Sequence, residues 1–481
     1  MGFHEKLIQD LDLGEAHSKE ASVERGKSLR AAVPRELHAQ WTPSLDRPDP
    51  VELLHSQDAS RVQELLPLRY ERMAASAFTF YRGAALIMAS DLSETPTTGI
   101  KVQACGDAHI SNFGLFYSPE RRTVFDINDF DETLPGPWEW DVKRLAASVE
   151  ICGRDNGFSK SDRKAAVLAC VRGYRESMNK FADMGHLDVW YTHFDAEALR
   201  DKVVANFGAE VVKEGDKVIA KAKAKDSARA VQKMTEIVDG QLRVVSQPPI
   251  IMPLRDLIEM DAEDNGVKPF NEKTLAKVLR AVLVEYRATL SSDKRRLIDE
   301  YTPVDIAHKV VGVGSVGTRA WIVVLQGASV DDVLVLQVKQ AGESVLERFV
   351  GKSKYKQHGH RVVAGQRAIQ TASDMLLGWC STPGVDGKKK DYYVRQLWDG
   401  KGSIDLSRLD PSKLALLAEM CGRTLAHAHA RTGNRFAIAA YLGNSKKFDK
   451  AIAKFASVYA DQNEADYERF MAAYQQVKQC G

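Results

Sequence analysis

The chain has few cysteines, no long hydrophobic run and almost no net charge. Its six cysteines stand singly among 481 residues, without a Cys-x-x-Cys pair or tight Cys/His spacing, which argues against a disulfide scaffold and a structural zinc site. No apolar run approaches the ~20 residues of a membrane-spanning helix, and the N-terminus lacks the apolar segment of a secretory signal. Lysine and arginine total 67 against 65 aspartates and glutamates, so the overall charge indicates neither nucleic-acid nor membrane binding. We therefore expect a cytoplasmic protein.

The composition is that of a folded globular protein. Hydrophobic residues make up 44% of the chain and charged residues 27%, which is ordinary usage for such proteins. The length accommodates roughly two to four domains. The regions that we predict are an N-terminal extended arm over 1–60, a helical lobe with the catalytic and metal loops over 61–300, a β-rich nucleotide-binding lobe over 301–400, and C-terminal helices over 401–481 that complete the helical lobe.

Periodicity predicts both helices and strands, so the expected fold class is α+β. The prolines between positions 34 and 50 break any regular helix there, which favours the extended arm. Apolar residues at three-to-four spacing predict helices between Pro67 and Pro96 and over 140–185, 272–300, 361–379, 412–430 and 446–478. Runs of β-branched and aromatic residues predict strands at 101–104, 122–125, 308–311, 320–325, 333–338 and 391–397. The Lys- and Ala-rich stretch 209–235 favours a solvated helix, with a basic ligand-facing surface as the alternative.

A glycine-rich motif lies between two predicted strands. Gly312, Gly314 and Gly317 let the backbone N–H groups approach a phosphate closely, and Ser315 and Val316 complete the motif. A β-type run follows, whereas a dinucleotide-binding loop needs a helix there. A tight hairpin without a ligand also fits the spacing, so the kinase, dinucleotide and ligand-free interpretations stay open.

Lys339 favours the kinase interpretation. Strand, glycine loop, strand, turn, strand and lysine is the order of a kinase nucleotide lobe, and Lys339 ends the last of these strands. A dinucleotide site would instead place an acid about 20 residues after the loop, close to the position of Lys339. We predict a kinase-type loop over the phosphates, which pair with Lys339.

Two acidic loops carry the residue types of phosphoryl transfer. Asp107 and Asn112 stand in one loop, and Asp129 and Asp131 follow a short strand in the other. Phosphoryl transfer needs an Asp that orients or deprotonates the acceptor hydroxyl, and an Asn and an Asp that hold magnesium. Carboxylates this close repel one another unless a cation lies between them, so we predict bound Mg²⁺.

Other chemistry uses some of the same residue types. A calcium loop is excluded, because Asp131 stands where it needs glycine and Pro137 where it needs the closing glutamate. A two-metal phosphoesterase uses Asp-x-His, which Asp107 and His109 match, with the histidines of 427–429 as further candidate ligands. Acidic turns that only cap helices are a third interpretation. His109 itself either contacts phosphate or braces its loop.

Longer stretches of the chain resemble known families. Gly106-Asp107-x-His109-x-x-Asn112, with Asp129-Phe130-Asp131, resembles the catalytic and metal loops of aminoglycoside phosphotransferases. Over residues 25–440 the chain more closely resembles the bacterial domain-of-unknown-function 2252 family, which is similar to protein-kinase-like folds. The resemblance implies ATP and Mg²⁺ as cofactors and names no substrate. The stretches that carry it are Phe80–Gly83, Cys105–Gly114, Phe125–Pro137, Glu139–Arg144, Val310–Thr318, Leu336–Lys339 and Val394–Leu397.

The resemblance also implies a role for each matched residue. Asp107 is the expected catalytic base, with His109 beside it in the catalytic loop. Asn112 and Asp129 are the expected metal ligands, assisted by Asp131. The expected nucleotide-binding residues are Gly312, Gly314, Ser315, Val316 and Gly317 over the phosphates, Lys339 paired with them, and Gln396 and Leu397 where a strand reaches the hinge that meets adenine.

The motifs stand in the reverse of the order that an ordinary kinase has. Both acidic loops precede the glycine loop, so we predict a circularly permuted, two-lobed kinase-like fold. The predicted helix 412–430 resembles the one that leads into the catalytic loop of kinases. No acid is an obvious partner of Lys339, although Glu343 and Glu347 lie near it in sequence. Asp141 starts a predicted helix, where it could cap the helix and brace the catalytic loop.

The function that we predict is Mg-ATP-dependent transfer of a phosphoryl group to a hydroxyl of a small molecule. One alternative is a metal-dependent phosphoester hydrolase that uses the acidic loops alone. The other is a non-catalytic ATP-binding module of the pseudokinase type. The identity of the acceptor and the oligomeric state stay open.

Overall fold

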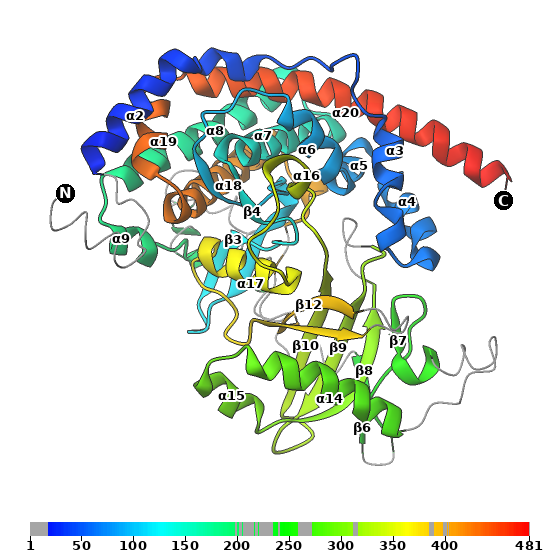
Figure 1. The fold of residues 1–481 in the computed structure, drawn as a ribbon. Coiled ribbons are helices and arrows are strands. Elements are labelled where there is room, and N and C mark those ends of the chain that lie inside the picture. The colour runs from blue at the N-terminus through cyan, green and yellow to red at the C-terminus, as the bar shows by residue number, and fades with distance from the viewer. Residues whose placement is uncertain are drawn as a thin grey trace.

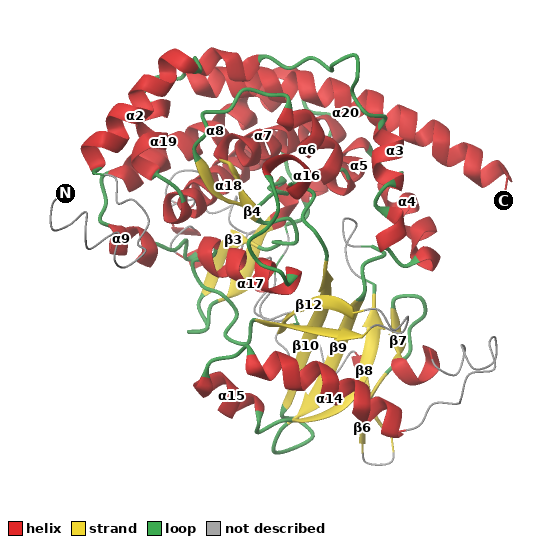
Figure 2. Ribbon diagram, viewed as in Figure 1, coloured by secondary structure: helices red, strands yellow, loops and turns green. Residues whose placement is uncertain are grey.

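Helices and strands occupy different regions of the molecule. The computed structural model describes residues 18–197, 234–238, 241–257, 272–310, 316–383, 389–397 and 404–480, with residue 402 and single positions between 200 and 220. Figure 1 shows most helices gathered in one body with the largest sheet beside it, and Figure 2 shows the same separation by colour. The α+β class that the sequence predicts is confirmed.

The largest sheet has six antiparallel strands. In spatial order they are β11 (Gly378–Pro383), β12 (Lys389–Gln396), β10 (Val333–Ala341), β9 (Ala320–Gln326), β8 (Thr302–Lys309) and β7 (Ile251–Pro253). Apolar residues such as Ile306, Val323 and Leu336 are buried on it, as suits a pleated surface. Helix α14 (Glu272–Ala288) packs on β8 and β11, and α17 (His358–Ile369) packs on β10, β11 and β12. The β-rich region expected over 301–400 is therefore a sheet, extended by β7.

Both ends of the chain contribute to the helical body. Its longest helices are α7 (Trp138–Asp155), α8 (Lys160–Ala182), α18 (Pro411–Thr432) and α20 (Lys447–Cys480). They bury one large apolar cluster, which is the main source of their stability. From the N-terminal end, α2 (Lys19–Ala32) packs on α19 (Arg435–Leu442), while η1 (Arg35–Ala39) and α3 (Pro50–His55) pack on α20. In Figure 1 the blue N-terminal segment therefore runs beside the orange-to-red C-terminal helices.

Short elements connect the helical body to the sheet. Strand β1 (Lys101–Ala104) pairs with β4 (Leu134–Pro137), and β2 (Phe113–Tyr117) pairs with β3 (Thr123–Ile127). The other short elements are η2 (Asp58–Ser60), η3 (Gln63–Leu65), α4 (Leu66–Met73), α5 (Ala77–Gly83), α6 (Ala85–Ser93), η4 (Ile110–Asn112), α9 (His186–Tyr191), β5 (Thr235–Val238), β6 (Gln241–Val244), α15 (Ser292–Ile298), α16 (Glu347–Val350) and η6 (Leu406–Arg408). Across the described residues, no helix has both the length and the apolar character of a membrane span.

The extended arm predicted for residues 1–60 is wrong for residues 19–32, which form α2. The hydroxyl of Ser18 accepts a hydrogen bond from the backbone N–H of Ala21 at 3.1 Å and caps this helix. The prolines that suggested an extended chain all lie after α2. The last of them, Pro50, begins α3, where its missing N–H costs nothing.

Some predicted helices are divided or shortened. The stretch between Pro67 and Pro96 is broken at Ser76, where Ser76 and Thr79 form a capping box that starts α5. The predicted helix 272–300 is two helices, α14 and α15, and the predicted helix 361–379 ends at Ile369 because the chain then enters β11. Strand pairing outweighs local periodicity there. The Lys- and Ala-rich stretch 209–235 lies almost entirely outside the described residues.

Candidate active site

Two loops that are separate in the sequence meet in the structure. The first loop, residues 105–112, follows β1, and the second loop, residues 128–133, follows β3. Gly106 has a φ of +81°, and a side chain there would collide with the main-chain oxygen of Glu132. The hydroxyl of Thr133 also donates to the main-chain oxygen of Ala104 at 2.7 Å. Glycine at position 106 thus allows the two loops to touch.

Asp107 is held by a buried arginine. Arg144, on α7, donates from Nε to Oδ1 of Asp107 at 2.5 Å and from Nη2 to the main-chain oxygen of Tyr81 at 3.1 Å. The Arg144 guanidinium also lies 4.4 Å from the centre of the Tyr81 ring. The Asp107 carboxylate is therefore oriented by a fixed cation and keeps its other oxygen for a further partner.

Asp141 braces the backbone of the first loop. Its carboxylate accepts hydrogen bonds from the backbone N–H groups of Cys105 at 2.6 Å and Gly106 at 3.0 Å. His429 lies 3.2 Å from the same carboxylate, and Tyr174 bonds the other ring nitrogen of His429 at 2.9 Å. The predicted bracing role is observed. The predicted capping role is wrong, because α7 begins earlier, at Trp138.

The other polar residues of the first loop make local contacts. The side-chain amide of Asn112 donates to the main-chain oxygen of Asp107 at 2.7 Å. His109 is buried, with Nε2 3.7 Å from Oδ2 of Asp107. Burial lowers the pKa of His109 to about 3, so its imidazole is neutral at pH 7. Asn112 and His109 therefore lie directly beside Asp107.

Lys339 finds its acidic partner in the second loop. It lies on β10, is almost fully buried and forms an ion pair with Asp131. The hydroxyl of Tyr393, on β12, donates to the other carboxylate oxygen of Asp131 at 3.0 Å. Burial lowers the pKa of Lys339, but the charges of Asp129 and Asp131 outweigh it and raise this pKa above its ordinary value.

The nearby acids considered from the sequence have other partners. Glu343 pairs with Lys352 at 2.7 Å. Glu347 accepts from the backbone N–H of Ser344 at 3.3 Å and lies 3.9 Å from Arg361. The partner of Lys339 could not be read from sequence proximity, because the ion pair joins residues 208 positions apart.

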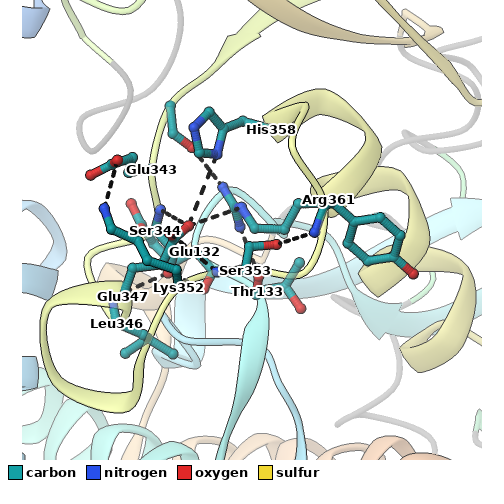
Figure 3. Close-up of polar contacts among 12 residues, drawn as sticks. Glu132, Thr133, Glu343, Ser344, Leu346, Glu347, Lys352, Ser353, His358 and Arg361 are labelled. Carbon is teal, nitrogen blue, oxygen red and sulfur yellow. Dashed lines mark hydrogen bonds and ion pairs between the residues drawn. The ribbon is translucent and has the colours of Figure 1, made fainter.

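Arg361 fastens the second loop to the sheet. From α17 it donates to the main-chain oxygens of Thr133 at 2.7 Å, Asp131 at 2.7 Å and Gly342 at 2.9 Å. Figure 3 shows Arg361 pointing into this group, with Glu132 beside it. The carboxylate of Glu132 accepts from the backbone N–H of Val345 at 2.7 Å. Burial raises the pKa of Glu132 to about 7.

The glycine motif is described only at its end. Gly312, Gly314 and Ser315 lie outside the described residues, whereas Val316 is buried and Gly317 has a φ of +87°. The main-chain oxygens of these two residues accept from Arg61 Nη1 at 2.7 Å and from the backbone N–H of Val62 at 2.8 Å, respectively. The chain just before η3 thus holds the C-terminal end of the motif.

The two expected hinge residues lie where β12 ends. The backbone N–H of Gln396 donates to the carboxylate of Asp374, and that of Leu397 donates to the main-chain oxygen of Val335 at 2.9 Å. Leu397 is buried. Both are therefore fixed at the end of the strand that pairs with the Lys339 strand.

One pocket joins both loops. Its lining is Gln57, Arg61, Arg82, Gly83, Ala85, Asp107, Asp129, Asp131 and Glu132. Of the predicted site residues, it brings together Asp107, Asp129 and Asp131, while Asn112 and His109 contact Asp107 without lining the pocket. Sequence reasoning missed Arg61, Arg82 and Glu132. The signal for Arg82 was present in Phe80–Gly83, one of the stretches that carry the family resemblance, to which no role in the site was assigned.

The two histidines considered for a two-metal site are structural. Nε2 of His427 bonds the main-chain oxygen of Val189 at 2.7 Å, and burial lowers the pKa of His427 to about 4. His429 braces Asp141. No group of three or more His, Cys, Asp or Glu side chains in the described part of the chain is arranged to hold a metal ion. Mg²⁺ held partly by nucleotide phosphates needs only one or two protein carboxylates.

A comparison with protein families identifies the chain. The profile of the family described as "Uncharacterized protein conserved in bacteria (DUF2252)" matches residues 61–473. The chain belongs to the DUF2252 family. Both loops, Lys339 and Arg82 lie inside the part that matches DUF2252. Neither the curated proteins nor the solved structures contain a match to this chain.

Proposed function

We propose that the protein transfers the γ-phosphoryl group of Mg-ATP to a hydroxyl of a small molecule. The observation that carries this proposal is the convergence of Lys339, Asp129, Asp131 and Asp107. Lys339 reaches the second loop from the sheet, and the three carboxylates line one pocket. A kinase needs a lysine on the phosphates, an acid on the metal and an acid on the acceptor close to one another.

Each residue has a part in this reaction. Asp107, oriented by Arg144, accepts the proton of the acceptor hydroxyl through its remaining oxygen. The oxygen donors of Asn112 and Asp129 suit Mg²⁺, which when bound neutralises charge on the nucleotide phosphates. Lys339 would bind the phosphates, which would leave Asp131, its partner in this structure, available to the metal. The acceptor and donor are thereby held in position, which supplies most of the rate of such transfers.

A circularly permuted kinase-like fold accounts for the order of the motifs. The lysine lies on the third strand counted from β8, with the glycine motif between the first two, as in kinases. The end of α18 lies against β1, since the hydroxyl of Thr432 accepts from the backbone N–H of Gln103 at 3.2 Å. In space, α18 therefore leads toward the first loop, although it follows that loop in the sequence.

Thermal unfolding with and without Mg-ATP tests this proposal. A ligand that binds only the folded state stabilises it by ~2.7 kcal/mol at ~100 times Kd. We expect a magnesium-dependent rise in Tm with ATP and none with NAD. In Lys339→Ala the rise is lost, whereas it persists in the exposed control Lys352→Ala. Absence of any shift with ATP overturns the proposal in favour of the phosphoester hydrolase. Binding without turnover across a panel of acceptor hydroxyls favours the pseudokinase.

A further inference from the structure

Arg82 is a cation in the pocket that has no hydrogen-bond or ion-pair partner among the described residues. It stands at the end of α5 and lines the pocket with Asp107 and Asp129. It makes no hydrogen bond or ion pair with any other residue that the structure describes, and its Nε is buried without a hydrogen-bond acceptor. A guanidinium that is taken from water without a partner costs free energy. The guanidinium therefore needs an acceptor that the described residues do not supply.

Comparison with arginines of the helical body supports this point. Arg144 pairs with Asp107. Arg175 donates from Nε and Nη2 to Asp449, and Arg47 bridges Asp91 and Asp466. These three arginines are structural, because each has its carboxylate partner in the helical body. Arg82 is the contrasting case, since its charge faces the pocket.

Arg82 lines the pocket beside two residues to which the proposed function gives a role. Burial lowers the pKa of Arg82, and the charges of Asp107 and Asp129 partly offset this lowering. Arginine stays protonated at neutral pH even so. In the proposed site Asp107 marks the acceptor hydroxyl and Asp129 marks the metal on the phosphates. The guanidinium thus lies near both ends of the path of the γ-phosphoryl group.

The backbone on both sides of Arg82 is fixed. The hydroxyl of Tyr81 donates to the main-chain oxygen of Arg144 at 2.8 Å, and the main-chain oxygen of Tyr81 accepts from Arg144 at 3.1 Å. On the other side, the main-chain oxygen of Gly83 accepts from Nη2 of the buried Arg69 at 3.4 Å. Donors held in place before reaction stabilise developing charge at little reorganisation cost.

We propose that Arg82 is a catalytic residue that binds the γ-phosphoryl group during its transfer. This inference rests on the proposed function. The acceptor oxygen forms its bond to the γ-phosphorus as the bond to the oxygen bridging the β- and γ-phosphates breaks. The hydroxyl proton goes to Asp107, and ADP leaves with the electron pair of the broken bond. Arg82 forms no covalent bond and donates hydrogen bonds to the non-bridging oxygens, whose charge it stabilises.

Arg61 serves as the internal contrast. It lines the same pocket but donates to the main-chain oxygen of Val316, at the end of the glycine motif. In the proposed site, Arg61 therefore supports the loop that binds the nucleotide before the reaction. Loss of Arg61 should therefore weaken Mg-ADP binding, whereas loss of Arg82 should not.

The test compares Mg-ADP alone with Mg-ADP plus aluminium fluoride, a planar mimic of the transferring phosphoryl group. The proteins are wild type, Arg82→Gln, Arg82→Lys and the exposed control Arg25→Gln, each checked for folding by circular dichroism. We expect the Kd of Mg-ADP to stay within about twofold in all four. Wild type and Arg25→Gln bind Mg-ADP more tightly when aluminium fluoride is added, and Arg82→Gln does not. Slow Mg-ATP hydrolysis, with water as the acceptor, falls about 10²–10³-fold in Arg82→Gln and recovers in part in Arg82→Lys.

The outcomes separate this inference from the proposed function. If wild type binds no Mg-ADP, the proposed function fails, and the inference fails with it. If wild type binds Mg-ADP but the fluoride effect and hydrolysis are the same in Arg82→Gln, only the role of Arg82 is overturned. Equal weakening of Mg-ADP and of the fluoride complex also overturns it, because Arg82 would then bind only the ground state. If Arg82→Gln does not fold, Arg82→Lys decides the question by the same measurements.

Discussion

The two ion pairs at the pocket are built in different ways. Asp107 pairs with Arg144, 37 positions along the chain and within the same helical body. Asp131 pairs with Lys339, 208 positions away and on the sheet. The first pair keeps its geometry whenever the helical body is folded. The second exists only while the sheet lies against the second loop. The acceptor side of the proposed site is therefore preformed, and the nucleotide side is assembled by contacts between the two regions.

The largest effect that we predict separates these two sides. Asp107→Asn keeps the shape of the acceptor side but removes the proton acceptor, so phosphoryl transfer falls about 10²–10⁴-fold. The Kd of Mg-ATP stays unchanged, because Lys339 and Asp129 remain. Titration calorimetry and a coupled ADP assay measure the two quantities. The exposed Glu24→Gln on α2 is the matched control. Full turnover in Asp107→Asn would rule out Asp107 as the base.

Breaking the internal pair tests whether the acceptor side depends on it. Arg144→Met leaves Asp107 without its buried cation, and we expect the free energy of unfolding to fall by about 3 kcal/mol. Arg172→Met removes a pair with Glu419 at the surface, where the Arg172 side chain is 45% exposed, and should cost under about 1 kcal/mol. Urea unfolding compares the two variants. Equal losses of unfolding free energy in the two variants would mean that Arg144 contributes no more to stability than a surface arginine.

Loosening the contact between the regions tests the assembled side. Arg361→Met removes three hydrogen bonds to main-chain oxygens of the second loop and of the end of β10. We expect a loss of about 1–3 kcal/mol in stability and a Kd for Mg-ATP that rises about tenfold, equivalent to ~1.4 kcal/mol. Arg287→Met, on the outer surface of α14, is the control. Unchanged Mg-ATP affinity in a folded Arg361→Met protein would show that the second loop holds its position without the sheet.

The last prediction concerns the helical body alone. His38 is fully buried against Tyr441, with 2.8 Å between Nε2 and the hydroxyl, and burial lowers its pKa to about 3. The unfolded chain, with a histidine pKa of ~6.5, binds the proton more readily. Stability from His38 is therefore full above pH ~6.5 and is lost as pH falls toward 3. Between pH 7 and pH 5 we expect a loss of about 2 kcal/mol.

Replacing His38 isolates this contribution. In His38→Gln the free energy of unfolding should depend less on pH over this interval, whatever the cost in packing. In His55→Gln, at a side chain that is 58% exposed, the free energy of unfolding should depend on pH as it does in wild type. Identical slopes in His38→Gln and wild type would assign the acid sensitivity to other buried histidines such as His109 and His427.

Much of the candidate site was predictable because its signals are local. The residue types in both loops, the strand that carries Lys339 and the strand that ends at Gln396 all follow from short patterns of the sequence. The extended N-terminal arm and the undivided helices before Pro96 were wrong where local signals compete. The Ser18 cap and the Ser76 capping box are themselves local signals. They outweigh the prolines, which favoured an extended chain, and the apolar spacing, which favoured an unbroken helical stretch.

The sequence by itself determined the α+β class, the acidic loops, the lysine on its strand and the family to which the chain belongs. Only the tertiary structure decided that Asp131 is the partner of Lys339, that Arg361 ties the second loop to the sheet, and that Arg82 lines the pocket with no hydrogen-bond partner among the described residues. The physical reason is that charge pairing and burial depend on distance in space. When a sheet from one part of the chain packs on loops from another, residues hundreds of positions apart become neighbours, and no local pattern records which of them will meet.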